Sequence, residues 1–331
     1  MLGLDVGTSY VIGARETDKG ITYREFRDAF FRIKPATPIA AKMIEKGLKG
    51  TKYFKDSDGS FVVIDKEAIV KAVERNSSAL RPLARGILSP KERDARRVFK
   101  FLLGKLLGKP KEKKEKLVYS IPAAPADVSS DDFDVGYHCD AIGNDLKELG
   151  FDPSPLNEAE AICYAELEED DYTGVSISAG AGMQNVCVMS SGEPVLIFSL
   201  ARSGDYVDRM AAASTAEPDS VVQMEKEAGD WEVGKENENR ILSAVSIYYV
   251  RLIKYVVEML SKKLNSADEL PRFPSAIPVV LSGGTSLAKG YVEEFKKQLA
   301  PVDLPFEVKE VRHAKEPLRA VAKGCLIAAS L

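Results

Sequence analysis

The sequence predicts an α/β protein of two domains, and three observations support this fold class. With 331 residues, 45% of them hydrophobic, the chain is long enough to form two cores. A strand-like run at 117–121 precedes helical patterns at 132–149 and 157–168, which favours parallel strands joined by helical crossovers. An apolar run, a glycine turn and a second apolar run occur at 2–14 and again at 175–188, so the two halves share one local pattern.

The first half of the chain begins with predicted strands at 2–4 and 10–14. Residues 20–88 are interpreted as a small inserted subdomain, with a hairpin at 53–64 that turns at Asp58-Gly59 and a short helix at 66–74. Ser89 and Pro90 are expected to begin an amphipathic helix that runs to residue 107. The lysine-rich run at 109–116 is interpreted as a solvated loop, and Gly150 is expected to end the helix at 132–149.

The second half of the chain is also predicted to consist of strands, turns and helices. The stretch at 175–188 is predicted to be two strands around a glycine turn, in which Ser178 occupies the position that Asp5 has in the first copy. Further strands are expected at 195–201, 276–281 and 307–311, and helices at 206–214, 221–228, 237–264, 291–299 and 318–329.

Composition and charge exclude several classes of function. The net charge is −4 with acidic and basic residues well mixed, so nucleic acid is not an expected partner. Four cysteines without a Cys-x-x-Cys pair, together with two histidines, argue against a disulfide framework or a zinc site and favour a cytoplasmic protein. No apolar run is long enough to span a bilayer, and no signal peptide or amphipathic anchor is visible, so no integral membrane segment is expected.

Three strands end in glycine turns, and these turns are the candidate functional features. They are Asp5-Val6-Gly7-Thr8, Gly180-Ala181-Gly182 and Gly283-Gly284-Thr285. Glycine lets a backbone approach an anion closely, so two such turns facing each other could hold the phosphates of a nucleotide, and the third its sugar and base. Each turn alone is also compatible with an ordinary hairpin, and none matches a Walker or Rossmann pattern.

The order and spacing of these motifs resemble the actin superfamily over nearly the whole chain. LGLDVGTS is similar to its first phosphate motif, GAG at 180–182 to its second, and VVLSGGTSLAKG to its adenosine motif. EAEAICYA at 158–165 and EPLRAVAKGC at 316–325 are similar to its connecting helices. RPLARGILS at 81–89, SGDYVDRM at 203–210 and the pair at 226–227 resemble the filament-forming prokaryotic branch that contains MreB and MamK.

The resemblance implies an actin-like (ribonuclease H-like) fold with ATP or ADP and Mg²⁺ between two lobes, and head-to-tail assembly of the chain with copies of itself. Domain I is expected at 1–168 and 316–331, with the insertion at about 20–88. Domain II is expected at 169–315, with a helical insertion at about 205–268. An accessory protein is a further partner that this branch would accommodate.

The resemblance also implies roles for individual residues. Asp5 is expected to hold Mg²⁺ largely through water, and Glu158 to orient and activate the attacking water. Asp205 and Glu227 would bind ribose, and Lys226 would pack on adenine; a solvated surface role is the alternative for each. The remaining nucleotide contacts are expected at Gly7, Thr8, Ser9, Ser178, Gly180, Ala181, Gly182, Gly204, Gly283, Gly284 and Thr285.

The second turn departs from the pattern of this superfamily. Ser178 stands where relatives carry aspartate, and Met183 where they carry threonine. Serine supplies a hydroxyl and no charge, so we expect nucleotide binding to persist and hydrolysis to be slow. The leading hypothesis is a cytoskeletal ATPase. A non-polymerising nucleotide-binding scaffold or pseudo-ATPase is the alternative, and a small-molecule kinase has no supporting motif.

Overall fold

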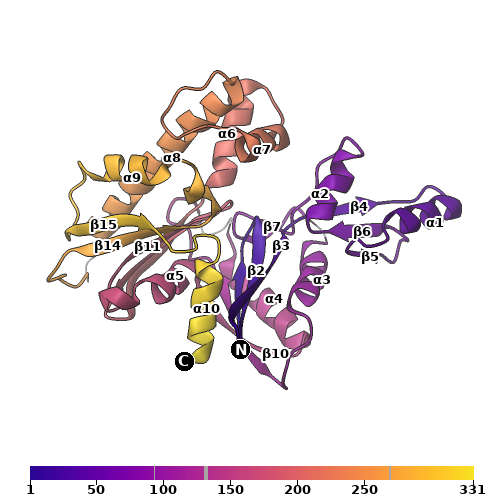
Figure 1. Cartoon of the computed structure of the whole chain (residues 1–331), viewed down its shortest axis with the longest axis horizontal. Coiled ribbons are helices and arrows are strands. Elements are labelled where there is room, and N and C mark those ends of the chain that lie inside the picture. Colours follow the sequence, from indigo (N-terminus) through magenta and orange to yellow (C-terminus); the bar gives the residue numbers. More distant parts are fainter. Residues whose placement is uncertain (93, 130–132, 268–269) are drawn as a thin grey trace.

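The computed structural model describes residues 1–92, 94–129, 133–267 and 270–331, and it forms two lobes, each built on a five-stranded sheet (Figure 1). The sheet of lobe I has the order β10-β9-β1-β2-β3, and the sheet of lobe II has the order β13-β12-β11-β14-β15. The predicted two-lobed α/β fold is therefore confirmed. The strands of lobe I are β1 (Leu2–Val6), β2 (Tyr10–Thr17), β3 (Gly20–Arg27), β9 (Glu115–Ile121) and β10 (Phe151–Asn157). The strands of lobe II are β11 (Gly174–Ala179), β12 (Gln184–Ser190), β13 (Glu193–Leu200), β14 (Ile277–Ser282) and β15 (Val308–His313).

The two sheets share one topology. In each sheet, the first three strands of the chain pair antiparallel with one another in sequence order. Two later strands then extend the sheet from the free edge of the first strand, and both of these pairings are parallel. Asp5 and Ser178 occupy the same position in the two sheets, because each is the second-last residue of the first strand of its lobe. In the hairpin that follows, Asp5 pairs with Ile12 and Ser178 pairs with Asn185. The correspondence between these two residues that the sequence suggested is thus a structural one.

Helices connect and cover the strands. In lobe I these are α3 (Ala95–Leu107), α4 (Val135–Glu148) and α5 (Glu158–Glu166), followed by the 3₁₀ helix η2 (Glu168–Asp170). In lobe II they are α6 (Gly204–Thr215), α7 (Asp219–Ala228), α8 (Arg240–Asn265) and α9 (Tyr291–Leu299), with the 3₁₀ helix η3 (Gly284–Leu287). The last helix, α10 (Ala320–Ser330), returns to pack on β1 and α5. No helix among the described residues is long and apolar enough to cross a bilayer.

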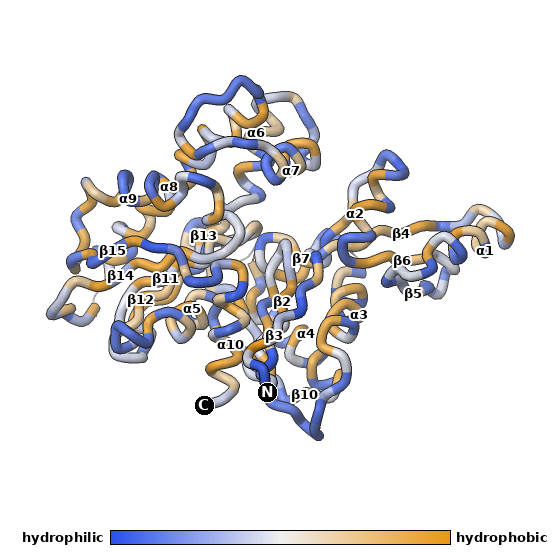
Figure 2. The backbone as a smooth tube through the Cα atoms, in the orientation of Figure 1, coloured by the Kyte–Doolittle hydropathy of each residue, from blue (hydrophilic) through white to orange (hydrophobic). Residues whose placement is uncertain are grey.

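Each sheet carries its own apolar core, visible as hydrophobic strands in Figure 2. In lobe II, α6 and α8 pack against the same core as the strands, with Val207, Leu252 and Val256 buried beside Ile177. Burying one such side chain contributes about 1.5–3 kcal/mol. The helices α6 and α8 of the expected helical insertion therefore share one core with the sheet of domain II.

The insertion in lobe I begins later than the sequence predicted. It comprises β4 (Phe30–Ile33), α1 (Pro38–Gly47), β5 (Tyr53–Lys55), β6 (Phe61–Ile64) and α2 (Lys66–Val73), and it extends away from the main sheet in Figure 1. Residues 20–27 instead form β3, the edge strand of the main sheet. This correction has a clear cause, because most side chains of β3 are exposed and the strand lacks an apolar face.

A short hairpin, β7 (Leu83–Ala84) and β8 (Ile87–Leu88), follows the insertion, and the next helix starts later than expected. The Ser89 amide donates to the Pro82 carbonyl at 2.8 Å and so closes the hairpin. Ser89 therefore does not begin a helix, and α3 starts at Ala95 after Asp94. The start of the helix expected at 132–149 lies partly outside the described residues, and α4 runs from Val135 to Glu148.

The packing of α10 on its neighbours depends on glycine. A Cβ atom at Gly324 would lie 1.7 Å from the Ala161 carbonyl oxygen of α5, and one at Gly3 would lie 2.2 Å from the Ala322 carbonyl oxygen. Both obstacles are backbone atoms, which cannot move without shifting a helix. The two helices that lie between the lobes therefore approach as closely as their backbones allow.

Replacement of this glycine is expected to disrupt the fold. Gly324→Val should lower the free energy of unfolding by more than about 3 kcal/mol, because overpacking against backbone exceeds the usual cost of a core insertion. Thermal melting followed by circular dichroism measures the change. Gly47→Val is the matched control, since a Cβ at Gly47 meets no atom within 4 Å. Equal melting temperatures for the two variants would contradict this account of the packing.

Candidate functional site

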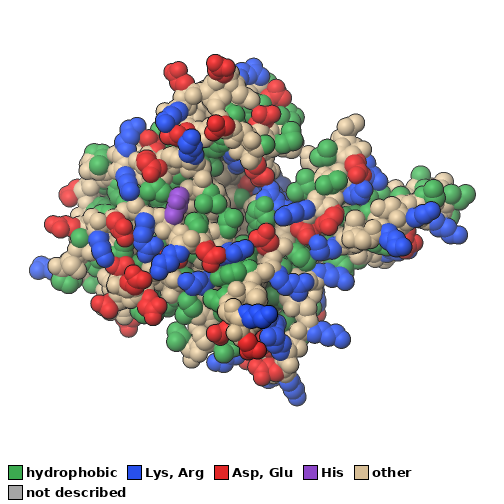
Figure 3. Space-filling view, in the orientation of Figure 1, with side chains coloured by type: hydrophobic (Ala, Val, Ile, Leu, Met, Phe, Trp, Pro, Cys, Tyr) green, Lys and Arg blue, Asp and Glu red, His purple; other side chains and the backbone are tan. Residues whose placement is uncertain are grey.

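A cleft of about 600 Å³ lies between the two lobes. It is lined by the ends of β1 and β11, the turn after β14, and the first turns of α5 and α6. Charged side chains of both signs are interspersed over the visible face of the molecule (Figure 3). The structure brings all of the predicted site residues to this cleft: Asp5, Gly7, Thr8, Ser9, Glu158, Ser178, Gly180, Ala181, Gly182, Gly204, Asp205, Lys226, Glu227, Gly283, Gly284 and Thr285.

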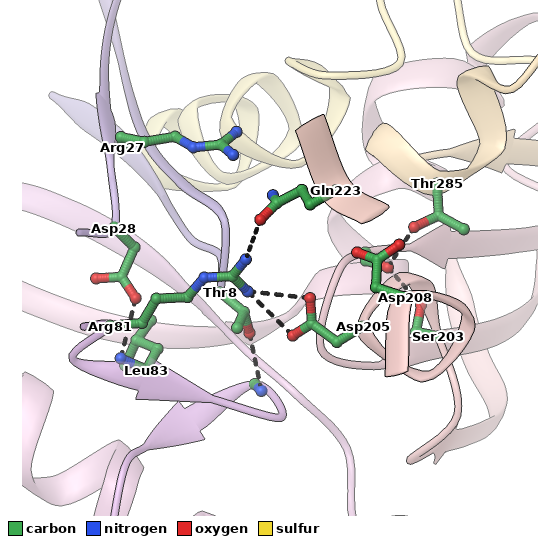
Figure 4. A network of polar contacts seen from close by, with 12 residues as sticks. Thr8, Arg27, Asp28, Arg81, Leu83, Ser203, Asp205, Asp208, Gln223 and Thr285 are labelled. Carbon is green, nitrogen blue, oxygen red and sulfur yellow. Dashed lines mark hydrogen bonds and ion pairs between the residues drawn. The ribbon is translucent and has the colours of Figure 1, made fainter. Parts of the chain in front are cut away.

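The first turn, at 7–9, presents free backbone donors to the cleft. The amide nitrogens of Gly7, Thr8 and Ser9 have no hydrogen-bond partner within the described part of the chain. The Thr8 hydroxyl accepts from the Gly86 amide at 2.9 Å, so its own proton stays available for an acceptor (Figure 4). Successive free amides in a turn form a concave site for anions.

The second turn, at 180–182, is fixed by its carbonyl groups and leaves amides free. The Gly180 carbonyl accepts from the hydroxyls of Ser203 and Thr285, the latter at 2.7 Å, and the Asp205 amide donates to the Ala181 carbonyl at 2.8 Å. The amides of Ala181 and Gly182 have no partner among the residues that the structure describes. The two turns therefore both present donors that suit phosphate oxygens.

The third turn supports the second. Gly283 has φ 88°, and a Cβ there would lie 2.4 Å from the Ala179 carbonyl oxygen. Glycine is required at this position both by the positive φ and by the close approach. The turn opens η3, and Leu287 and Ala288 add apolar lining to the cleft beside Trp231.

The two lobes touch directly beside the phosphate-sized turns. A Cβ atom at Gly182 would lie 2.5 Å from the Thr8 hydroxyl oxygen and 2.7 Å from the Gly86 amide nitrogen, both of lobe I. The next residue, Met183, is buried in a small apolar cluster with Ile87 and Phe133 of lobe I. Where superfamily members were expected to carry threonine, this chain has a methionine that joins the lobes by apolar packing.

Glu158 begins α5 and is buried at the floor of the cleft. It accepts hydrogen bonds from the Ser178 hydroxyl at 3.2 Å and from the Asn185 amide at 3.0 Å. Burial raises the pKa of Glu158 to about 7, although the two hydrogen bonds oppose the rise. Ser178 thus holds the predicted catalytic carboxylate, a role that its sequence pattern did not indicate.

Asp5 lies at the end of β1 and accepts from the Ser120 hydroxyl at 3.3 Å. Burial and the negative charge of Glu158 raise the pKa of Asp5 well above its ordinary value, while the Ser120 hydrogen bond lowers it. Two carboxylates that destabilise each other's charge are a favourable place for a cation. No cluster of three or more His, Cys, Asp or Glu residues suited to a metal occurs in the described ranges.

This donor set fits Mg²⁺ bound together with a nucleotide. Mg²⁺ prefers oxygen ligands, keeps several waters, and is commonly held by one or two carboxylates plus phosphate oxygens. A phosphate ligand would need a counter-ion in this cleft, because the described lining contains six carboxylates and three cationic side chains. The carboxylates are those of Asp5, Glu158, Asp205, Asp208, Glu227 and Asp230, and the cations are Arg27, Lys226 and Lys289.

The residues expected to bind the nucleoside are engaged in ion pairs. Lys226 donates to both oxygens of Asp208 at 2.7 and 2.9 Å, so its ammonium group is held by this pair. Asp205 pairs with Arg81, and Glu227 pairs with Arg27. The two arginines were not predicted as site residues. Arg81 begins the RPLARGILS motif, but nothing in the local sequence indicates its partner 124 residues away.

Solved structures of actin-like proteins match this chain over almost its full length. A MamK double helical filament matches with a TM-score of 0.71 and 19% identity, covering 100% of this chain and 98% of that one. MreB5 of Spiroplasma citri bound to AMPPNP matches with a TM-score of 0.68 and 15% identity, covering 98% and 94%. The ethanolamine utilization protein EutJ from Carboxydothermus hydrogenoformans matches with a TM-score of 0.53 and 15% identity, covering 98% and 88%.

The chain therefore has an actin-like fold, as the sequence motifs predicted. No curated protein matches the sequence. A family model named Volactin matches residues 1–329, and the chain belongs to this family.

Proposed function

We propose that this protein binds ATP with Mg²⁺ between its lobes and polymerises head to tail into cytoskeletal filaments. The observation that carries the proposal is the pair of glycine turns, whose free amides face one cleft of about 600 Å³ that is large enough for a nucleotide. A contact between unlike surfaces of successive copies does not close on itself and so gives an open polymer. The four free cysteines support a reducing, cytoplasmic setting.

The residues have distinct tasks in this proposal. The amides of the first and second turns bind phosphate oxygens, and Asp5 orients water molecules around Mg²⁺, which would neutralise charge on the phosphates. Glu158 accepts a proton from the attacking water when it is ionised. Ser178 donates its hydroxyl proton to Glu158 and adds no charge, so hydrolysis is expected to be slow.

Sedimentation with and without nucleotide tests the function. Pelleting by ultracentrifugation with ATP, ADP and no nucleotide, followed by electron microscopy of the pellets, should show filaments that depend on ATP. A protein that binds ATP yet forms no filaments at any nucleotide state or salt concentration would contradict polymerisation. That result would favour the alternative, a non-polymerising nucleotide-binding scaffold or pseudo-ATPase.

A charge at position 178 is expected to speed hydrolysis. Ser178→Asp should raise phosphate release from ATP at saturating Mg²⁺ about tenfold, a factor that matches one charge-assisted contact. The same variant should melt at a lower temperature without Mg²⁺, because a third carboxylate would lie beside Glu158 and Asp5. Ser178→Ala is the control, since it removes the hydroxyl without adding charge. Unchanged phosphate release in the Asp variant would contradict the explanation of slow turnover.

A further inference from the structure

Two arginines of lobe I extend across the cleft to carboxylates of lobe II. Arg81, just before β7, places Nη1 3.0 and 3.1 Å from the two oxygens of Asp205, in the first turn of α6 (Figure 4). Arg27, the last residue of β3, places Nη2 3.1 Å from a carboxylate oxygen of Glu227 on α7. Both pairs therefore connect lobe I to helices of lobe II.

One glutamine joins the two ion pairs into a continuous network. The Gln223 side-chain oxygen accepts from Arg81 Nη2 at 3.4 Å, and its amide nitrogen donates to Glu227 at 2.9 Å. The same Glu227 oxygen accepts from Arg27. Because Gln223 also lines the cleft, the network runs along the cleft wall from one arginine to the other.

Lobe I holds the Arg27 guanidinium and the backbone next to Arg81 in place. Arg81 precedes a hairpin that is anchored by the Leu83 amide, which donates to the buried Asp28 carboxylate at 2.9 Å. The Arg27 guanidinium lies over the Tyr10 ring at 4.5 Å, and the Arg27 amide donates to Asp65 at 2.8 Å. An arginine fixed in this way presents a rigid fork of donors, so it loses little further entropy when it orients a carboxylate.

The two carboxylates that the arginines contact, those of Asp205 and Glu227, are the ones that the sequence resemblance assigns to the ribose hydroxyls. A carboxylate has about four acceptor positions, so each keeps room for a hydroxyl donor beside its arginine. The Asp205 amide also donates to the Ala181 carbonyl of the second turn. Movement of Asp205 would therefore also shift the second turn, at the phosphate end of the cleft.

We propose that Arg81 and Arg27 are positioning residues, which orient Asp205 and Glu227 from the opposite lobe so that ribose is recognised only when the lobes are closed. This inference rests on the proposed nucleotide binding and adds a condition to it. If the inference is correct, the preference for a nucleotide with ribose hydroxyl groups depends on Arg81 and Arg27 of lobe I, and neither arginine has to touch the nucleotide.

The test compares ATP with 2′,3′-dideoxy-ATP, which lacks both ribose hydroxyls. Trp231, the single tryptophan of the chain, lines the cleft and provides an intrinsic fluorescence signal for binding. The wild-type protein should bind ATP at least about tenfold more tightly than the dideoxy analogue. Arg81→Met and Arg27→Met should bind both nucleotides with the affinity that the wild type has for the analogue.

Arg97→Met is the matched control. Arg97 also makes an ion pair, with Asp56, and also lies over an aromatic ring, that of Phe54, but both contacts are within lobe I. It should keep the wild-type preference for ATP. An unchanged preference in Arg81→Met or Arg27→Met, in whichever variant is folded by circular dichroism, would overturn the inference while leaving nucleotide binding intact. Failure of the wild type to bind either nucleotide would overturn the inference and the proposed function together.

Discussion

At about pH 8 the Glu158→Gln variant is expected to melt at a higher temperature than the wild-type protein and to release phosphate from ATP far more slowly. Both effects follow from one buried carboxylate at the floor of the cleft. Loss of a general base typically slows a reaction about 10²–10⁴-fold. The expected gain in stability is what distinguishes a functional carboxylate from one that holds the fold together.

The sign of the stability effect follows from the pKa of Glu158, which burial raises from 4.5 to about 7. Between these values the folded protein binds more protons than the unfolded chain, so this group makes the free energy of unfolding fall as pH rises. This decrease in the free energy of unfolding is complete above about pH 7, and it amounts to as much as about 3 kcal/mol. Glutamine stays neutral and can still accept the two hydrogen bonds, so it avoids this loss.

Thermal melting of the nucleotide-free protein between about pH 5 and pH 8 measures the first effect, and a phosphate-release assay measures the second. The variant should show a flatter dependence of melting temperature on pH than the wild type. Glu160→Gln is a suitable control, because Glu160 lies on the same helix, is only partly buried and is bonded to Tyr164. A Glu158→Gln variant that melts lower at pH 8 and hydrolyses ATP normally would contradict the assigned role.

Gly182→Val is expected to weaken binding of ATP with Mg²⁺ at least about a hundredfold. A Cβ at this position has no space, since it would lie 2.5 Å from the Thr8 hydroxyl oxygen and 2.9 Å from the Arg85 Cα atom. The second turn would have to move away from the first, and the donors of the two turns would no longer converge on one phosphate group. A displacement of about 1 Å at a binding site is enough for a loss of this size.

Calorimetric titration with ATP and Mg²⁺ measures this loss, and Gly47→Val again serves as the control because its Cβ meets open space. Melting temperatures of both variants show whether the fold persists. Wild-type affinity in a folded Gly182→Val protein would show that the two turns do not act on the same ligand.

The sequence predicted the sheets and the cleft because both depend on local signals. Apolar runs that end in glycine turns place Asp5, Ser178 and Gly283 at strand ends. Asp5 and Ser178 lie on equivalent strands of the two lobes, and Gly283 follows the strand next to that of Ser178, so the topology brings the three residues together. The strand β3 was missed because most of its side chains are exposed, which removes the alternation that identifies a strand. Ser89 does not cap a helix because its amide closes the β7–β8 hairpin, and a capping pattern cannot reveal such a contact.

The parts of the site that could not be predicted are pairings between distant residues. Arg81 meets Asp205 only because a hairpin of lobe I reaches α6 of lobe II, and Ser178 serves Glu158 only because β11 lies beside α5. Met183 looked like a simple departure from a polar pattern. Its burial with Ile87 and Phe133 of lobe I shows that this methionine makes an apolar contact between the lobes.

A crystal structure of the protein with AMPPNP and Mg²⁺ tests the central claim most directly, because it locates the nucleotide. The account predicts phosphates between the turns at 7–9 and 180–182, with Asp5 facing the metal through water and the ribose within hydrogen-bond distance of Asp205 or Glu227. Density for the nucleotide outside this cleft, or none at saturating concentration, would contradict it.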